Sequence, residues 1–138
     1  MPDLDTILVG DARWRDFYGL HSTGWGRDEP GAVSLVAEAF AHPAKVRPDL
    51  AQRIVSHALE QGWWARGDVL VDPFFGVGGF GLVCGFNGVG VVGVELEPHF
   101  FALAEQNIAL HDVVWGRNGH VRPVVLQGDS RELCRLVS

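Results

Sequence analysis

Three carboxylates stand where they could bind a nucleoside cofactor. Asp72, Glu95 and Asp129 each follow a short apolar run, and a glycine-rich loop at 74–79 follows the first run. If the runs are parallel strands, all three side chains meet at the carboxyl edge of one sheet, where ligands of open α/β sheets bind. Glycine lets the backbone approach a ligand closely, and the helix after such a loop offers free N–H groups to a carboxylate or phosphate.

The spacing assigns part of a nucleoside to two of these acids. Glu95 stands about 20 residues after the start of the loop, where an acid can accept hydrogen bonds from both ribose hydroxyls. Asp129 lies where an adenine amino group could donate a hydrogen bond to it. These residues by themselves therefore indicate a cofactor built on adenosine.

The strand tip, more than the glycines, decides which cofactor is favoured. Gly76, Gly78 and Gly81 satisfy G-x-G-x-x-G, but this match is weak in a chain with 18 glycines. In a dinucleotide fold the first glycine follows the strand closely, whereas here a charged acid and three further residues intervene. The Asp72 carboxylate would repel a pyrophosphate but suits the ammonium group of an amino acid. The sequence thus favours S-adenosylmethionine, with a nicotinamide dinucleotide as the less favoured alternative.

Apolar periodicity and turn residues predict alternating strands and helices after residue 47. This order predicts an α/β fold, namely a partial Rossmann-like doubly wound parallel sheet formed by its first three strands. The domain at 42–138 would then be incomplete at its C-terminal end. The expected strands are 69–71, 90–94 and 121–126, and the expected helices are 48–61, 80–86, 98–110 and 131–136. On the third helix the expected buried face contains Phe101, Ala104, Ile108 and Ala109.

Four segments resemble motifs of S-adenosylmethionine-dependent DNA amino-methyltransferases, which make N6-methyladenine or N4-methylcytosine. Residues 72–78, DPFFGVG, resemble the signature D-P-F-x-G-x-G of this family. Residues 42–45, HPAK, resemble the segment that wraps the methionine end of the cofactor. Residues 93–98 resemble the family's ribose-binding strand end, and residues 127–130 resemble the strand end that carries its adenine-side acid.

The resemblance covers most of the chain and implies S-adenosylmethionine as the cofactor. It departs at Val46, where the family usually has phenylalanine, and at Gly79 and Phe80, where it usually has threonines. The residues that it implies as cofactor-binding are His42, Pro43, Ala44, Lys45, Asp72, Pro73, Phe74, Gly76, Gly78, Gly79, Glu95, Leu96, Asp129 and Ser130.

The tetrapeptide with which this family grips the flipped base is missing from the sequence. It reads D/N/S-P-P-Y/F/W, whereas all seven prolines of this chain stand singly. The resemblance therefore implies a cofactor-binding portion with no catalytic residue and no target-recognition region. DNA would be the substrate of the complete enzyme, as in a restriction-modification system. A non-catalytic S-adenosylmethionine-binding module and a subunit of a split methyltransferase remain alternatives.

Charge and composition limit the partners of the chain. A duplex DNA binder needs a cationic surface to displace counterions, but the net charge is −6 over 138 residues and Lys45 is the only lysine. Any DNA contact must be local or supplied from elsewhere. Cys84, Cys134 and the six histidines lack metal-ligand spacing, so we expect no metal and a reduced, cytoplasmic setting. The longest apolar runs fall short of about 18 residues, so we expect no membrane span.

Residues 1–41 are predicted to form an N-terminal extension. Residues 6–9 could be a short strand, 21–31 have the composition of a loop, and 32–40 suit a short helix or a segment packed on the domain. Trp14 and Trp25 could stack on a base or on the adenine, although a place in the core is the simpler expectation.

The strand at 69–71 should have one unpaired edge, because a fourth strand would belong there. Such an edge invites pairing with another chain unless it is covered. We expect the N-terminal extension, a second polypeptide or a second copy of this chain in a homodimer to cover it.

Overall fold

The computed structural model describes residues 24–42 and 45–138, which form a parallel sheet with helices packed on it. The sheet contains β3 (Val69–Asp72), β4 (Gly90–Glu95) and β5 (Val124–Gln127), hydrogen-bonded in the order β3-β4-β5. Both strand pairs are parallel. This confirms the predicted partial Rossmann-like α/β fold. Strand β5 begins three residues later than expected, because the Val121 N–H donates to the carbonyl of Gly85 and not to a neighbouring strand.

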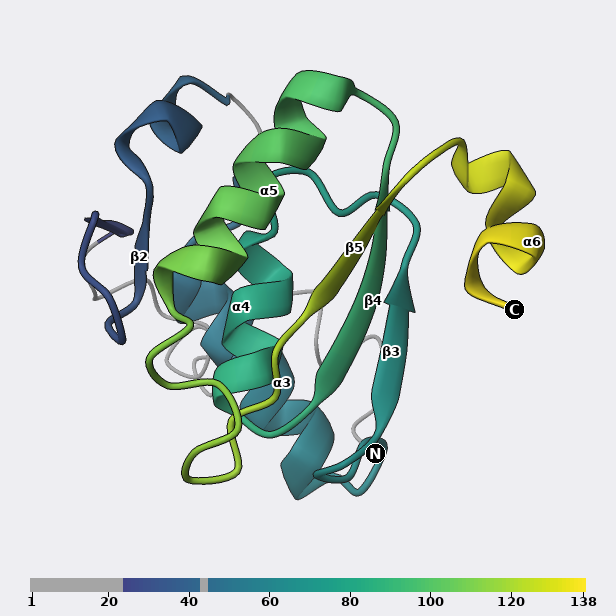
Figure 1. The fold of residues 1–138 in the computed structure, drawn as a ribbon. Helices are drawn as coiled ribbons and strands as arrows, with labels where there is room; N and C mark the ends of the chain where they lie inside the picture. The colour runs from purple at the N-terminus through teal and green to yellow at the C-terminus, as the bar shows by residue number, and fades with distance from the viewer. Residues whose placement is uncertain (1–23, 43–44) are drawn as a thin grey trace, which may run out of the picture.

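Three helices cover one face of the sheet (Figure 1): α3 (Pro48–Glu60), α4 (Gly79–Phe86) and α5 (Pro98–Leu110). Proline opens α3 and α5 at a position where a missing N–H costs nothing. The core lies between these helices and the sheet, and it includes Ala51, Val55, Leu82, Val91, Leu103 and Ile108. A short 3₁₀ turn, η2 (Ser130–Glu132), leads into α6 (Leu133–Val137) beyond the opposite side of the sheet.

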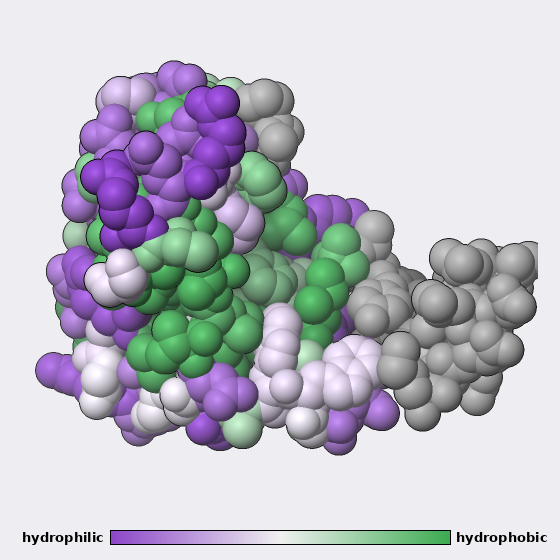
Figure 2. Space-filling view, turned by 90° about the vertical axis from the view of Figure 1, so that its right-hand side faces the viewer, coloured by the Kyte–Doolittle hydropathy of each residue, from purple (hydrophilic) through white to green (hydrophobic). Residues whose placement is uncertain are grey.

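The face of the sheet away from α3, α4 and α5 carries exposed valines. Val69 is 64% exposed, and Val71 and Val124 are each 46% exposed. Figure 2 looks onto this side of the molecule and shows hydrophobic residues gathered on it. Within the described part of the chain, β3 pairs with β4 alone, so its outer edge is open as predicted.

Residues 24–41 pack against α5. They form a second, parallel pair of very short strands, β1 (Gly26–Arg27) and β2 (Ser34–Leu35), followed by the 3₁₀ helix η1 (Ala37–Ala41). The expectation of a loop at 21–31 was therefore wrong at β1. Of the two alternatives expected at 32–40, a short helix or a segment packed on the domain, the structure shows a packed segment whose second half forms η1. The strand expected at 6–9 and Trp14 lie outside the described residues.

Two buried polar residues hold residues 24–41 in place: Asn107 in α5, and His111 at the C-terminal cap of α5. Asn107 accepts a hydrogen bond from the Val36 N–H at 2.8 Å through Oδ1. His111 accepts from the Gly31 N–H at 3.1 Å through Nδ1, and its Nε2 lies 2.9 Å from the Ser34 carbonyl oxygen. A carbonyl only accepts, so Nε2 carries the proton and the ring is neutral. Burial lowers the pKa of His111 below its ordinary value of 6.5.

Acidification should destabilise the protein through His111. Below about pH 6.5 the unfolded chain takes up a proton at this ring that the folded chain resists, so the free energy of unfolding falls as pH falls. Replacement by glutamine, H111Q, supplies one acceptor and one donor without a titrating group. Urea unfolding between about pH 7.5 and about pH 5.5 should therefore give a steeper loss of stability for the wild type than for H111Q. Equal pH slopes would contradict this.

None of the described helices has both the length and the apolar character that a membrane-spanning helix needs.

Candidate functional site

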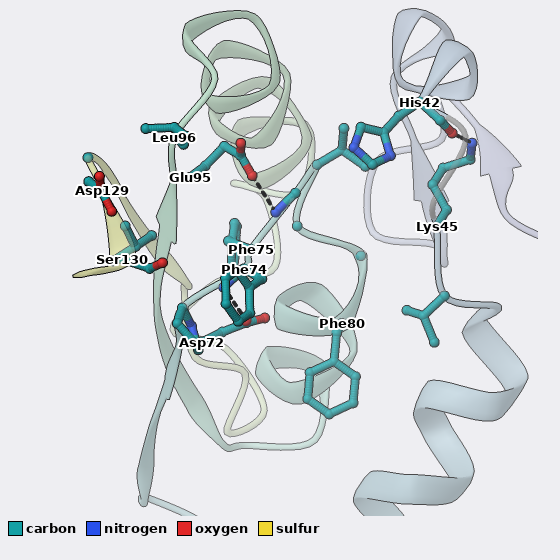
Figure 3. Close-up of a pocket in the computed structure, with 18 residues that line it drawn as sticks. His42, Lys45, Asp72, Phe74, Phe75, Phe80, Glu95, Leu96, Asp129 and Ser130 are labelled. Atoms are coloured by element: carbon teal, nitrogen blue, oxygen red, sulfur yellow. Dashed lines mark hydrogen bonds between the residues drawn. The ribbon is translucent and has the colours of Figure 1, made fainter. Parts of the chain in front are cut away.

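A cavity of about 410 Å³ opens at the carboxyl ends of the three strands (Figure 3). Every predicted site residue that the structure describes lines it: His42, Lys45, Asp72, Pro73, Phe74, Gly76, Gly78, Gly79, Glu95, Leu96, Asp129 and Ser130. Pro43 and Ala44 lie outside the described residues. The further lining residues, which the sequence did not single out as cofactor-binding, are Val46, Phe75, Val77, Phe80, Val94 and Gly128.

Glu95 ties the end of β4 to the glycine loop. Its Oε2 accepts a hydrogen bond from the Gly76 N–H at 2.8 Å, and its Oε1 accepts from the Glu97 N–H at 2.9 Å. Each carboxylate oxygen has two lone pairs, so each can accept one more hydrogen bond from a ligand. Figure 3 shows this side chain beside the loop at the top of β4.

Asp72 ends β3 and begins the loop. Its Oδ1 accepts a hydrogen bond from the Phe74 N–H at 2.9 Å, which forms a local turn at the strand tip. The turn leaves Phe74 80% exposed. Phe74 is therefore not part of the core, and its ring is available to a ligand.

Asp129 both caps the turn after β5 and lines the cavity. Its Oδ1 accepts from the Arg131 N–H at 2.9 Å, and the Arg131 guanidinium forms a salt bridge with the same carboxylate. Hydrogen bonds from Arg131 lower the pKa of Asp129 to about 2, so the group is ionised at neutral pH. The Arg131 guanidinium also donates to Oδ2, so both oxygens of Asp129 are occupied, and a ligand would have to displace this exposed guanidinium while the backbone cap at Oδ1 stays in place.

His42 and Lys45 approach the loop from the opposite wall. The His42 ring stacks edge-on against Phe100, with centroids 4.3 Å apart, and lies within 4 Å of the space that a β-carbon at Gly76 would occupy. The Lys45 ammonium group donates to the carbonyl oxygens of His42 and Phe40 at the end of η1. The lysine therefore supplies the positive charge on this wall.

Phe75 is the buried anchor of the loop and only 5% exposed. Its N–H donates to the Val94 carbonyl at 3.0 Å, and its ring lies against Gly78, Gly81 and Gly93. Gly78 has a φ of 91°, which favours glycine, and α4 starts at the next residue. The first N–H groups of that helix lack helical partners and are available near the cavity. Sequence reasoning missed Phe75, although its position between Asp72 and three glycines was a usable signal.

This arrangement is suited to a ligand that carries both a positively and a negatively charged group. Asp72, Glu95 and Asp129 supply negative charge along the strand ends, whereas Lys45 and the N-terminus of α4 favour an anionic group at the other side. Exposed apolar side chains, Phe74 and Leu96, provide surfaces for a flat ring.

No protein-family model matches the chain. The type II methyltransferase M.XycI of Xanthomonas campestris pv. cyanopsidis is 35% identical to it over 83 residues, which is 60% of this chain and 24% of that protein. The similarity thus spans about a quarter of the relative's length. It supports a methyltransferase-related function, and the three-stranded parallel sheet is consistent with part of a Rossmann-like methyltransferase fold.

Proposed function

We propose that this chain is the S-adenosylmethionine-binding portion of a DNA methyltransferase that modifies the exocyclic amino group of adenine or cytosine. One observation carries the proposal: three carboxylates from three strand ends line a single cavity beside a glycine loop. The similarity to a type II methyltransferase supports the same class.

The residues of the cavity fit this cofactor. Glu95 would accept hydrogen bonds from the ribose hydroxyls and Asp129 from the adenine amino group. Asp72 would accept from the ammonium group, and Lys45 would hold the carboxylate of the amino-acid end. The cavity volume of about 410 Å³ lies within the usual range for small-molecule sites. When bound, the cofactor would supply an activated methyl group for direct transfer to an amino nitrogen.

We propose further that the groups that hold the target base lie outside these 138 residues, because the sequence contains no Pro-Pro pair. The open edge of β3 and the exposed valines beside it would receive the missing strand, from a continuation of the same polypeptide or from a second one. A second copy of the chain could cover this edge but would not supply the missing groups. A basic surface on that part would compensate for the acidic charge of this chain. The alternative, a non-catalytic binding module, has the same cavity but needs no such partner.

Titration calorimetry on the chain tests this assignment. We expect binding of S-adenosylmethionine and of its demethylated product, and no binding of NAD, because Asp72 would face the pyrophosphate. A parallel assay with labelled cofactor and DNA should show no methyl transfer by the chain alone. Binding of NAD without S-adenosylmethionine would overturn the cofactor assignment. Methyl transfer by the isolated chain would overturn the proposal that the base-holding groups lie elsewhere.

A further inference from the structure

Trp25 joins two walls of the cavity without lining it. Its indole N–H donates to the Val46 carbonyl oxygen at 2.8 Å, and Val46 belongs to the wall that carries His42 and Lys45. We call residues 42 and 45–47 of this wall the strap. The expectation that Trp25 stacks on a cofactor or a base does not match this position, because its ring lies behind the cavity wall.

The indole ring also contacts the first residue of α4. A β-carbon at Gly79 would lie 2.8 Å from Cζ2 of Trp25, which is too short for two carbon atoms. The ring therefore packs directly on the Gly79 backbone, and only glycine fits there without displacing it. Gly79 lines the cavity opposite the strap, so one side chain touches both walls.

A buried amide fixes the same two parts of the molecule a second time. Asn107 donates to the carbonyl oxygen of Val77 in the glycine loop at 2.8 Å and accepts from the Val36 N–H at 2.8 Å. The segment that carries Trp25 and the strap is thus held to the loop through α5. His42 of the strap also contacts Phe100 of α5, and Trp25 adds a hydrogen bond to the strap backbone at Val46.

We propose that Trp25 is a positioning residue for S-adenosylmethionine. It sets the distance between the strap and the glycine loop, so that the His42 ring faces the loop across the cavity and Lys45 lines the same wall. This inference rests on the proposed function and adds that the N-terminal segment takes part in cofactor binding. The two ends of the cofactor would then depend on different walls of the cavity. The strap would hold the amino-acid end, whereas the wall with Leu96, Asp129 and Ser130 would hold the adenosine end.

The replacement W25F tests this role, because phenylalanine keeps an aromatic ring but has no N–H for Val46. We expect the dissociation constant of S-adenosylmethionine to rise about tenfold, in line with the loss of one partly buried hydrogen bond. The dissociation constant of adenosine should change less than about twofold, because adenosine does not need the strap. General destabilisation of the protein would instead raise the dissociation constants of both ligands by the same factor. W115F is the matched control, because Trp115 also donates to a backbone carbonyl, that of Ile108, at 2.8 Å but does not touch the cavity.

The replacement G79A gives an independent test by pushing the indole away. It should weaken S-adenosylmethionine binding about tenfold in the wild-type background and less than about threefold in W25F, because phenylalanine does not extend to the indole Cζ2 position. If W25F binds S-adenosylmethionine as tightly as the wild type, or loses affinity for S-adenosylmethionine and adenosine equally, the positioning role of Trp25 is overturned. The proposed function stands in either case. A wild type that binds no S-adenosylmethionine overturns the proposed function, and this inference with it.

Discussion

Replacement of Glu95 by glutamine should weaken S-adenosylmethionine binding about 100-fold. Glutamine has a single acceptor oxygen, so it cannot accept from both the Gly76 and the Glu97 N–H groups as Glu95 does. Its NH₂ group would face one of these donors, and the negative charge toward the ribose hydroxyls would be lost. A hydrogen bond to a charged group contributes about 1.5–3 kcal/mol, so the loss of one or two of them gives a factor of this size.

Calorimetry on E95Q and on the control E105Q measures this effect. Glu105 is exposed on α5, and its replacement removes the same charge without touching the cavity. E105Q should bind within about twofold of the wild type. Urea unfolding of E95Q separates lost affinity from lost structure, because the orphaned backbone N–H should cost about 1–3 kcal/mol. If E95Q bound the cofactor as tightly as the wild type, Glu95 would have no part in the site.

Replacement of Gly93 by alanine should strongly destabilise the fold. The added β-carbon would lie 2.0 Å from Cδ2, 2.2 Å from Cγ and 2.7 Å from Cβ of Phe75. The ring cannot retreat, because its far edge already lies against Gly78 and Gly81. We expect a loss of more than ~3 kcal/mol, the upper end for overpacked cores, from a domain whose total stability is about 5–15 kcal/mol.

Thermal and urea unfolding of G93A test this expectation. G24A is the control, since no atom lies within 4 Å of a β-carbon at that position; it should stay within about 0.5 kcal/mol of the wild type. The double variant F75L/G93A should recover at least ~1 kcal/mol relative to G93A, because leucine frees part of the contested space. A G93A chain that melts like the wild type would show that Phe75 is not the fixed anchor of the loop.

The sequence predicted the elements that carry the site but not the packing that supports them. Strand ends at Asp72, Glu95 and Asp129 were readable, because apolar runs and glycine turns mark them locally. Gly81 and Gly85 are poor helix formers inside the segment at 80–86 that is predicted to be a helix. In the structure these glycines allow close contact with the Phe75 ring and with the carbonyl oxygen of Val121. The second contact joins residues 85 and 121, which are far apart in the chain, so no local pattern reveals it. The first spans only six residues, but it depends on the fold of the loop before α4.

The buried face of α5 shows the same limit. Apolar spacing predicted Phe101 and Ala109 on this face, but the structure buries Leu103 and Asn107 together with the correctly predicted Ala104 and Ile108. Polar residues are assigned to the surface by any hydropathy argument. Asn107 is buried because the N-terminal segment and the glycine loop both supply hydrogen-bond partners to it, and neither partner is visible from the helix sequence.

The bonds that hold this N-terminal segment also bear on the order in which the molecule assembles. Asn107 and Val36 are 71 residues apart in sequence, and His111 and Gly31 are 80 apart. Contacts of such long range form after the local ones, because the chain must first close a long loop at an entropic cost. We therefore expect the segment with Trp25 to dock late, onto an α5 that is already folded, and the strap wall to be completed last. We expect the same segment to open in the folded protein at a lower free energy than the sheet, so that local unfolding would reach the strap before it reaches the strands.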